Sequence, residues 1–242
     1  MKELFNYFLN EANYFVIYGL SFLYFCVLYF ALAPLFLSIC RRLEKHKILE
    51  LVVINRLPKN QIKSEIKHSL VSIIIFGFSG VVMLFMYREK WVDFIEPTVS
   101  NTLLGALILT LWNELHFFVV HRIMHIPFLY RTVHKIHHQS KISTVYSVYS
   151  FHWLEATLLS TVPMTIAPFF NFSASAIFLY PLASILLNYA GHCNYRFGKG
   201  EGVFWKLIST RHAFHHFKNS KNFGFALTTF DWLFTSNKKT KH

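Results

Sequence analysis

The 242-residue sequence has little cysteine and no dedicated linker. Its three cysteines, Cys26, Cys40 and Cys193, form no CxxC pair. Isolated cysteines in an odd number predict neither a disulfide framework nor a thiolate metal site. Internal repeats, low-complexity tracts and Gly/Ser-rich stretches are also missing from the sequence. A single domain over residues 1–242 is therefore expected, rather than a string of modules.

Acidic residues are scarce: the chain has 12 Asp and Glu but 24 Lys and Arg, which gives a net charge of +12. A basic balance can indicate nucleic-acid binding, but the sequence holds no recognisable nucleic-acid-binding motif. The basic residues lie between apolar runs, which is typical of loops on the anionic, cytoplasmic side of a membrane. No nucleic-acid partner is expected.

Hydrophobic residues, by contrast, make up 54% of the chain and include 27 Phe, which is typical of a multi-pass membrane protein. Long apolar runs cover residues 14–40, 69–87, 97–120 and 156–190. The last is about twice the length of a ~20-residue span, and "PFFN" at 168–171 is interpreted as the turn of a helical hairpin. The predicted fold class is all-α and transmembrane, with about four or five spans and a histidine-rich helical cap.

The basic residues between positions 41 and 68 place that segment in the cytoplasm by the positive-inside rule. The N-terminus then lies outside, while the basic C-terminal stretch "NKKTKH" lies inside. Every dense group of histidines falls on the cytoplasmic face in this orientation. The membrane is expected to be a bacterial inner membrane or the endoplasmic reticulum.

Nine of the fourteen histidines form a pattern that is typical of metal ligands. HxxxH comprises His121 and His125, one HxxHH comprises His134, His137 and His138, a second comprises His212, His215 and His216, and His192 stands alone. Side chains three or four residues apart share one face of a helix, and neutral imidazole is the commonest protein metal ligand. Nine imidazoles exceed one site, so the sequence predicts two metals.

The chemistry of this ligand set leaves the metal open. It contains no thiolate and no carboxylate pair, unlike a structural zinc site or a Glu-rich di-iron bundle, and imidazoles suit iron, zinc, copper or nickel. A metal transporter is an alternative, although its expected mid-membrane ionisable residues are nearly missing. A zinc-dependent membrane hydrolase is another, although HExxH is missing. A bis-histidine haem site would need paired histidines within the spans.

Five stretches between residues 113 and 236 resemble the fatty acid hydroxylase/sterol desaturase superfamily: "ELHFFVVHRIMHIPFLYRTVHKIHH", "FHWLE", "NYAGHCNY", "RHAFHHFKNSKNFG" and "FDWLFTS". The resemblance implies an integral-membrane oxygenase with two non-haem Fe ions, which uses O₂ to hydroxylate or desaturate a sterol-like or fatty acyl lipid. Residues 97–242 would then be the catalytic region, and residues 1–96 would hold the N-terminal spans and the basic loop. A separate electron donor, such as a cytochrome b5, a ferredoxin or a reductase, is implied, because no Gly-rich flavin or dinucleotide loop is present.

Two departures from the family pattern leave a tenth ligand open. Trp153 follows His152 where the family usually has Pro, and Asn188 stands where some members have a further histidine. His152 is a candidate ligand, or else a hydrogen-bond partner of Glu155 one helical turn on. Asn188 is a candidate to hold a metal-bound water.

Two carboxylates are candidates for supporting roles. Glu114 lies two helical turns before His121, on the same face. It is expected either to accept a hydrogen bond from a ligand histidine, which would fix its tautomer, or to pack inside the bundle. Asp231 matches the family's C-terminal Asp and is expected to orient an imidazole or to cap a helix. Pro127 is expected to end the helix that carries His121 and His125.

Overall fold

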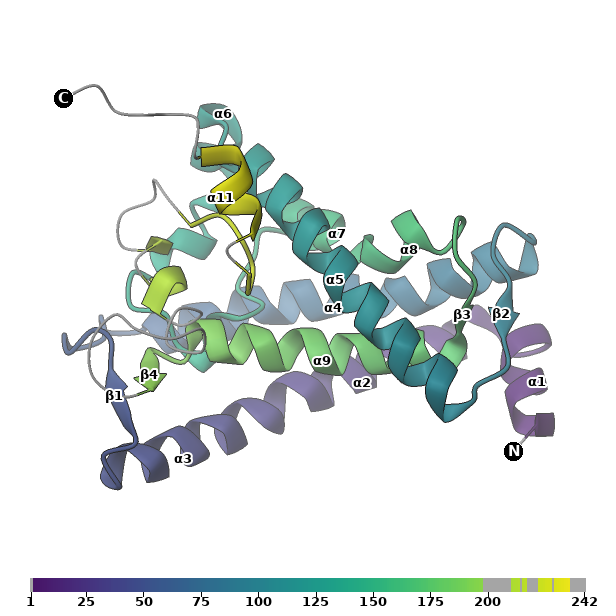
Figure 1. The fold of residues 1–242 in the computed structure, drawn as a ribbon, viewed down its shortest axis with the longest axis horizontal. Helices are drawn as coiled ribbons and strands as arrows, with labels where there is room; N and C mark the ends of the chain where they lie inside the picture. Colours follow the sequence, from purple (N-terminus) through teal and green to yellow (C-terminus); the bar gives the residue numbers. More distant parts are fainter. Residues whose placement is uncertain (1, 198–209, 214, 217–221, 228, 236–242) are drawn as a thin grey trace.

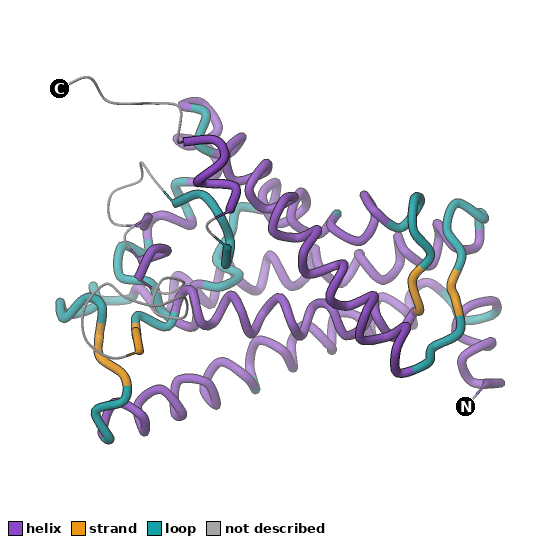
Figure 2. The backbone as a smooth tube through the Cα atoms, in the orientation of Figure 1, coloured by secondary structure: helices purple, strands orange, loops and turns teal. Residues whose placement is uncertain are grey.

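The computed structural model describes residues 2–197, 210–213, 215–216, 222–227 and 229–235, and this part of the chain is mostly helical, with very little strand (Figure 1, Figure 2). Four helices are long and apolar enough to cross a membrane: Tyr14–Lys45, Gln61–Arg88, Val99–Met124 and Ala174–His192. The shortest of them has 19 residues and is about 28 Å long, close to the ~30 Å thickness of a hydrocarbon core. The predicted all-α, multi-pass class is confirmed.

The first long rod consists of α2 (Tyr14–Phe30) and α3 (Leu32–Lys45), which are joined through Ala31 in helical backbone geometry. It is apolar on its outer side as well as its inner side: Phe15 is 84% exposed while Leu28 is buried. An apolar outer face suits contact with lipid tails rather than water. The short helix α1 (Lys2–Asn10) precedes the rod.

The long helices pack as two pairs, α2 with α4 (Gln61–Arg88) and α5 (Val99–Met124) with α9 (Ala174–His192). Small residues allow the close approach within each pair. A Cβ atom on Gly105 of α5 would lie 2.7 Å from the Cβ of Ala176 in α9. A Cβ atom on Gly80 of α4 would lie 2.9 Å from the hydroxyl of Ser21 in α2. Larger side chains at these glycines would force the pairs apart.

The segment 156–190 forms a hairpin whose first arm differs from the prediction. The turn lies at residues 167–171, as expected, and α9 forms the second arm. The first arm is not one continuous span, because it is divided into α7 (Trp153–Ser160) and α8 (Val162–Ile166). Pro163 stands in the first turn of α8 and has no N–H with which to continue the hydrogen bonding of α7. This broken arm packs against both α4 and α5 and so connects the two helix pairs.

Short strand pairs mark the two ends of the bundle. β2 (Phe94–Ile95) pairs in parallel with β3 (Phe172–Ser173) at one end. β1 (Leu49–Leu51) pairs antiparallel with β4 (Tyr195–Phe197) at the other end, on the left of Figure 1. Both α5 and α9 run from the β2–β3 end towards the β1–β4 end (Figure 1). We call the β1–β4 end the histidine end, because the last turns of α5 and α9 carry His121 and His192 there.

Candidate metal centre

The HxxxH motif lies at the C-terminal end of α5. His121 is in the last turn, α5 ends at Met124, and His125 is the C-terminal cap. Pro127 begins a separate short helix, α6 (Pro127–Leu129). The prediction that Pro127 ends the helix carrying this motif is confirmed.

The first HxxHH motif does not lie on a regular α-helix, and here the expected geometry is wrong. A wide π-helical turn at Tyr130–His134 is followed by a tight 3-10 turn at His137–Gln139. The change of helical pitch rotates the second half of the motif relative to the first. As a result the neighbouring His137 and His138 point to different places.

The remaining four histidines come from later in the chain. His192 is the last residue of α9. Residues 210–213 and 215–216 are helical, and they bring His212, His215 and His216 to the same end of the bundle. All four side chains are buried.

The structure brings all nine predicted histidines together in two adjacent groups. The five-histidine group contains His121, His125, His134, His138 and His215; the four-histidine group contains His137, His192, His212 and His216. Within each group the candidate ligand nitrogens all lie within 4.8 Å of one another. The groups adjoin, since the ring centroids of His138 and His216 are 4.8 Å apart. Each group offers enough imidazoles to hold one metal ion.

Hydrogen bonds from Nδ1 atoms to backbone carbonyls orient two of these rings. The Nδ1 of His121 donates to the carbonyl of Phe223 at 2.9 Å. The Nδ1 of His192 donates to the carbonyl of Asn188 at 3.0 Å. Both partners only accept, so in each ring the proton is on Nδ1 and the lone pair is on Nε2. Such tautomer control is the usual role of the groups behind metal-bound histidines.

The Nε2 atoms converge at distances that suit a shared cation. His212 and His192 approach to 2.9 Å, and His125 and His215 approach to 3.2 Å. The Nε2 of His121 is buried and has no hydrogen-bond partner within the described residues. A bound cation can accept the lone pairs of imidazole nitrogens that converge in this way. The donor set therefore fits a pair of metal ions.

Burial keeps the imidazoles neutral. Desolvation, followed by the repulsion of neighbouring imidazoles, lowers the pKa of His125 from its ordinary 6.5 to about 3. The same two causes, in the same order, lower the pKa of His137, His212 and His216 well below the ordinary value. Neutral imidazole is the form that binds metals, so these groups are ready for a metal at neutral pH.

Glu155 is a supporting carboxylate that the sequence interpretation did not assign to the metal centre. It is buried, and its Oε1 lies 2.8 Å from the Nδ1 of His134. The expected hydrogen bond between Glu155 and His152 is not what the structure shows. His152 caps α7 instead, where its Nδ1 accepts from the N–H of Leu154 at 3.2 Å, and it lies outside both histidine groups. The "FHWLE" stretch carried the signal, since it places a carboxylate between the two HxxHH motifs.

Glu114 is buried, but it does not contact a histidine as one of the two predictions required. Its carboxylate accepts from the backbone N–H groups of Ala226 and Leu227, at 3.0 to 3.1 Å. These bonds satisfy both oxygens and fasten the C-terminal segment across α5. The role of Glu114 is thus to position the backbone that returns to the metal centre.

Asp231, in α11 (Thr229–Thr235), organises the same segment. Its carboxylate accepts from the guanidinium of Arg211 at 2.7 Å and from the backbone N–H groups of Phe223 and Gly224 at 2.8 and 3.0 Å. The carbonyl of Phe223 in turn accepts from His121. Asp231 therefore supports an imidazole indirectly, through one residue of backbone.

Glu65 of α4 was also missed by the sequence interpretation, because it lies in a stretch that looks like a solvated basic loop. It is 2% exposed. Its carboxylate accepts from Gln61 at 2.7 Å, Ser140 at 2.7 Å and Thr144 at 2.6 Å. The loop that follows His138 is thereby fixed to α4.

Asn188 lies one helical turn before His192, outside both histidine groups. Its side-chain Nδ2 donates to the carbonyl of Val148 at 3.1 Å, while its backbone carbonyl accepts from His192. The structure thus shows Asn188 as a brace between α9 and the loop before α7. Its predicted role in holding a metal-bound water stays a prediction.

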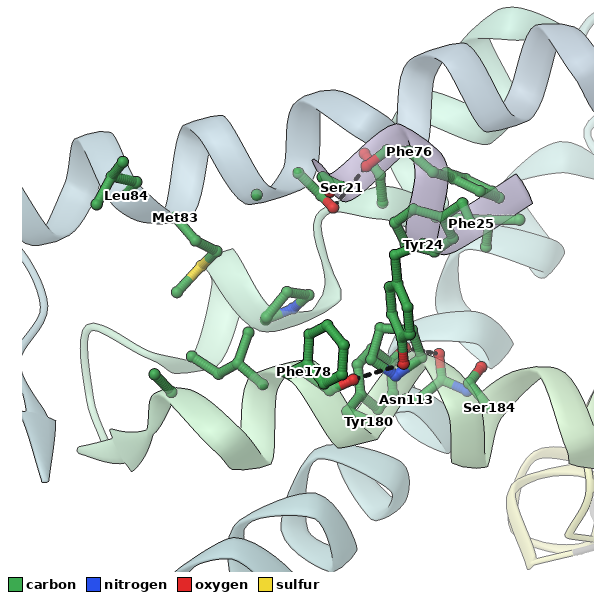
Figure 3. Close-up of a pocket in the computed structure, with 18 of the residues that line it drawn as sticks. Ser21, Tyr24, Phe25, Phe76, Met83, Leu84, Asn113, Phe178, Tyr180 and Ser184 are labelled. Carbon is green, nitrogen blue, oxygen red and sulfur yellow. Dashed lines mark hydrogen bonds between the residues drawn. The ribbon is translucent and has the colours of Figure 1, made fainter. Parts of the chain in front are cut away.

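A cavity of about 350 Å³ is lined by residues of all four long helices, α2, α4, α5 and α9 (Figure 3). Most of its lining is apolar or aromatic. Phe117 lines it, and its ring centroid is 4.9 Å from that of His121. Phe151 lines it too, and its ring centroid is 4.8 Å from that of His137. The cavity wall therefore touches both histidine groups.

The sequence matches the fatty acid hydroxylase family over residues 106–236, more than half of the chain. The chain belongs to this family. The superfamily resemblance predicted from the histidine motifs is thereby confirmed.

Several curated proteins are similar to this chain. Human "Fatty acid hydroxylase domain-containing protein 2" is 26% identical over 169 residues, which cover 68% of this chain and 49% of that protein. "Delta(7)-sterol 5(6)-desaturase erg3C" of Aspergillus fumigatus is 25% identical over 168 residues, covering 60% and 49%. "Fatty acid hydroxylase ahd1" of Mycosarcoma maydis is 24% identical over 146 residues, covering 60% and 36%. The chain thus spans half or less of the length of these relatives, and no solved structure matches it.

The region that matches the fatty acid hydroxylase family contains the whole candidate metal centre but only part of the cavity wall. All nine histidines, together with Glu155 and Asp231, lie inside residues 106–236. The α2 and α4 walls of the cavity lie before residue 106. The family region supplies the candidate ligands, and helices outside it complete the space beside them.

Proposed function

We propose that this chain is a membrane-bound, non-haem di-iron oxygenase that hydroxylates or desaturates a lipid. The observation that carries the proposal is the pair of buried histidine groups at the end of an apolar cavity. Iron is preferred over zinc because zinc has no redox chemistry, whereas the curated relatives are named for hydroxylation and desaturation. The mostly apolar and aromatic lining of the cavity suits a hydrocarbon.

Both reactions consume O₂ and two electrons. Hydroxylation converts R–H, O₂, two protons and two electrons into R–OH and one water. Desaturation of a CH–CH unit uses the same inputs and gives C=C and two waters. Two irons held by the histidine groups would supply O₂ activation and the oxidation of an unactivated C–H bond. The electrons would come from a separate cytochrome b5-, ferredoxin- or reductase-like protein.

The chain's own residues would hold the metal ions, orient the histidine rings and shield the site from water. Glu155 and the carbonyl of Phe223 fix the tautomers of His134 and His121, so that Nε2 is the binding atom. Phe117 and Phe151 stand between the cavity and the histidines. They exclude water and hold the lipid against the reacting centre.

We place the histidine end on the cytoplasmic face of a bacterial inner membrane or of the endoplasmic reticulum. The support is that the basic segment after α3 pairs through β1 with β4, directly after His192. A lipid would reach the cavity sideways from the bilayer, while the electron donor would bind from the aqueous side.

Metal analysis of protein purified without oxygen tests this proposal. We expect about two irons per chain and no haem absorbance. His215→Ala and His137→Ala each remove one member of a different group and should each lower the iron content and abolish turnover. His46→Ala, at an exposed histidine that belongs to neither group, is the matched control. Stoichiometric zinc in the native protein, or turnover that survives either histidine change, would contradict the proposal.

Lipid analysis of cells with and without the active protein identifies the reaction. A lipid that gains one oxygen indicates hydroxylation, and a lipid that loses two hydrogens indicates desaturation. The product must disappear in the His137→Ala strain while the His46→Ala strain retains it. An unchanged lipid profile under iron-replete, electron-supplied conditions would count against an oxygenase.

A further inference from the structure

Asn113 of α5 places a polar group on the wall of an otherwise mostly apolar cavity. It is 5% exposed and lines the cavity together with Tyr180 and Ser184 of α9 (Figure 3). The hydroxyl of Tyr180 donates to the Oδ1 of Asn113 at 2.9 Å. The Nδ2 of Asn113 has no hydrogen-bond partner within the described residues.

An unpaired amide N–H at this depth is costly, because neither water nor lipid tails satisfy it. The amide is oriented with its Oδ1 towards the hydroxyl of Tyr180, from which it accepts, and this leaves Nδ2 as the free donor. Tyr24, another polar residue of the lining, already donates to the carbonyl of Phe178 at 2.7 Å. Asn113 is thus a preorganised donor without an acceptor.

We propose that the Nδ2 of Asn113 donates a hydrogen bond to an oxygen of the lipid substrate. This inference rests on the proposed function, because it takes the cavity as the substrate site. The described lining contains no charged side chain, so an ionised carboxylate would be buried without a counter-ion. The substrate class is therefore a neutral lipid that carries a hydroxyl, carbonyl or ether oxygen.

The position of Asn113 also determines which carbon is oxidised. Asn113, Phe117 and His121 follow one another at four-residue steps on one face of α5. Eight residues separate Asn113 from His121, which corresponds to about 12 Å along the helix axis. A lipid whose oxygen is bound at Asn113 presents a distant carbon to the histidines, not the carbon next to its oxygen.

Equilibrium binding of matched lipids to the purified holoprotein tests the inference without requiring turnover. The probes are radiolabelled cholesterol with its deoxygenated counterpart cholest-5-ene, and octadecan-1-ol with octadecane. We expect the wild type to prefer the alcohol of at least one pair by roughly tenfold, the effect of one hydrogen bond. Asn113→Leu should lose that preference while keeping its affinity for the hydrocarbon and its metal content. Tyr180→Phe removes the hydroxyl that orients the side-chain amide of Asn113, so the preference for the alcohol should fall to about threefold.

Thr110→Val is the matched control. Thr110 lies one turn before Asn113, outside the cavity lining, and its hydroxyl is bonded within α5 to the carbonyl of Ala106. Its replacement should leave the preference unchanged. Equal binding of alcohol and hydrocarbon by the wild type, no binding of either alcohol, or an undiminished preference in Asn113→Leu overturns the inference. Lipid binding is measured separately from oxidation. A purified protein without iron would therefore refute the oxygenase proposal, while the preference of Asn113 for an alcohol could still be measured.

Discussion

The hydrogen bond between Glu155 and His134 allows a quantitative test of the metal centre. The two side chains are buried, and the Oε1–Nδ1 distance is 2.8 Å. A hydrogen bond to a charged group stabilises by about 1.5–3 kcal/mol, whereas a neutral one contributes about 0.5–1.5 kcal/mol. Glu155→Gln should therefore cost about 1.4 kcal/mol, which is tenfold in iron affinity.

Glu155→Ala should cost more, because it leaves the Nδ1–H of His134 buried without an acceptor. Loss of such a partner behind a metal-bound histidine typically weakens binding by about 10–100-fold. His134 belongs to the five-histidine group, so the iron in the four-histidine group should be retained. The two irons should then leave in separate steps.

Competition with the ferrous chelator ferrozine measures these affinities directly. We expect the wild type to release both irons over a single range of ferrozine concentration. Glu155→Gln should release half of its iron at a roughly tenfold lower ferrozine concentration. Glu50→Gln is the control, since Glu50 is 37% exposed and forms a loose surface ion pair with Arg196 at 3.7 Å. If the Glu155 and Glu50 variants release iron alike, the assignment of Glu155 to the metal centre is refuted.

Two further predictions concern stability, both measured as thermal unfolding in detergent. Glu65→Ala removes the acceptor of three hydrogen bonds and should lower the free energy of unfolding by about 3 kcal/mol, whereas the exposed Glu11→Ala should have little effect. Gly105→Ala brings a methyl group to 2.7 Å from Ala176 and should destabilise by about 1–3 kcal/mol, whereas Gly19→Ala, with nothing within 4 Å, should not. Equal unfolding temperatures within either pair would contradict the corresponding contact.

Features set by local periodicity could be predicted from the sequence. The four long helices follow from uninterrupted apolar runs, and the end of α5 follows from Pro127. The nine histidines could be identified because their spacing has a direct geometric meaning on a helix. Even so, the spacing did not reveal the π-helical turn before His134, because that turn depends on packing and not on composition.

Long-range polar contacts could not be predicted in the same way. Glu114 was expected either to bond an imidazole or to pack inside the bundle. It is buried, and its partners are two backbone N–H groups more than a hundred residues away. Backbone amides have no sequence signature, so nothing in the residues near Glu114 indicates them. Glu65 was overlooked for a similar reason, since its hydroxyl partners Ser140 and Thr144 are common residues in an ordinary loop.

The distribution of the nine histidines along the chain imposes an order on biosynthesis. Four members of the five-histidine group lie within residues 121–138, so most of that group exists before α9 is translated. Three members of the four-histidine group come from residue 192 onwards, and the backbone that Glu114 and Asp231 fasten is made later still. A nascent chain can therefore assemble most of the five-histidine group early, and it completes the four-histidine group only when the C-terminal segment folds back. The four-histidine group is thus completed only after the helices that line the neighbouring cavity have been made.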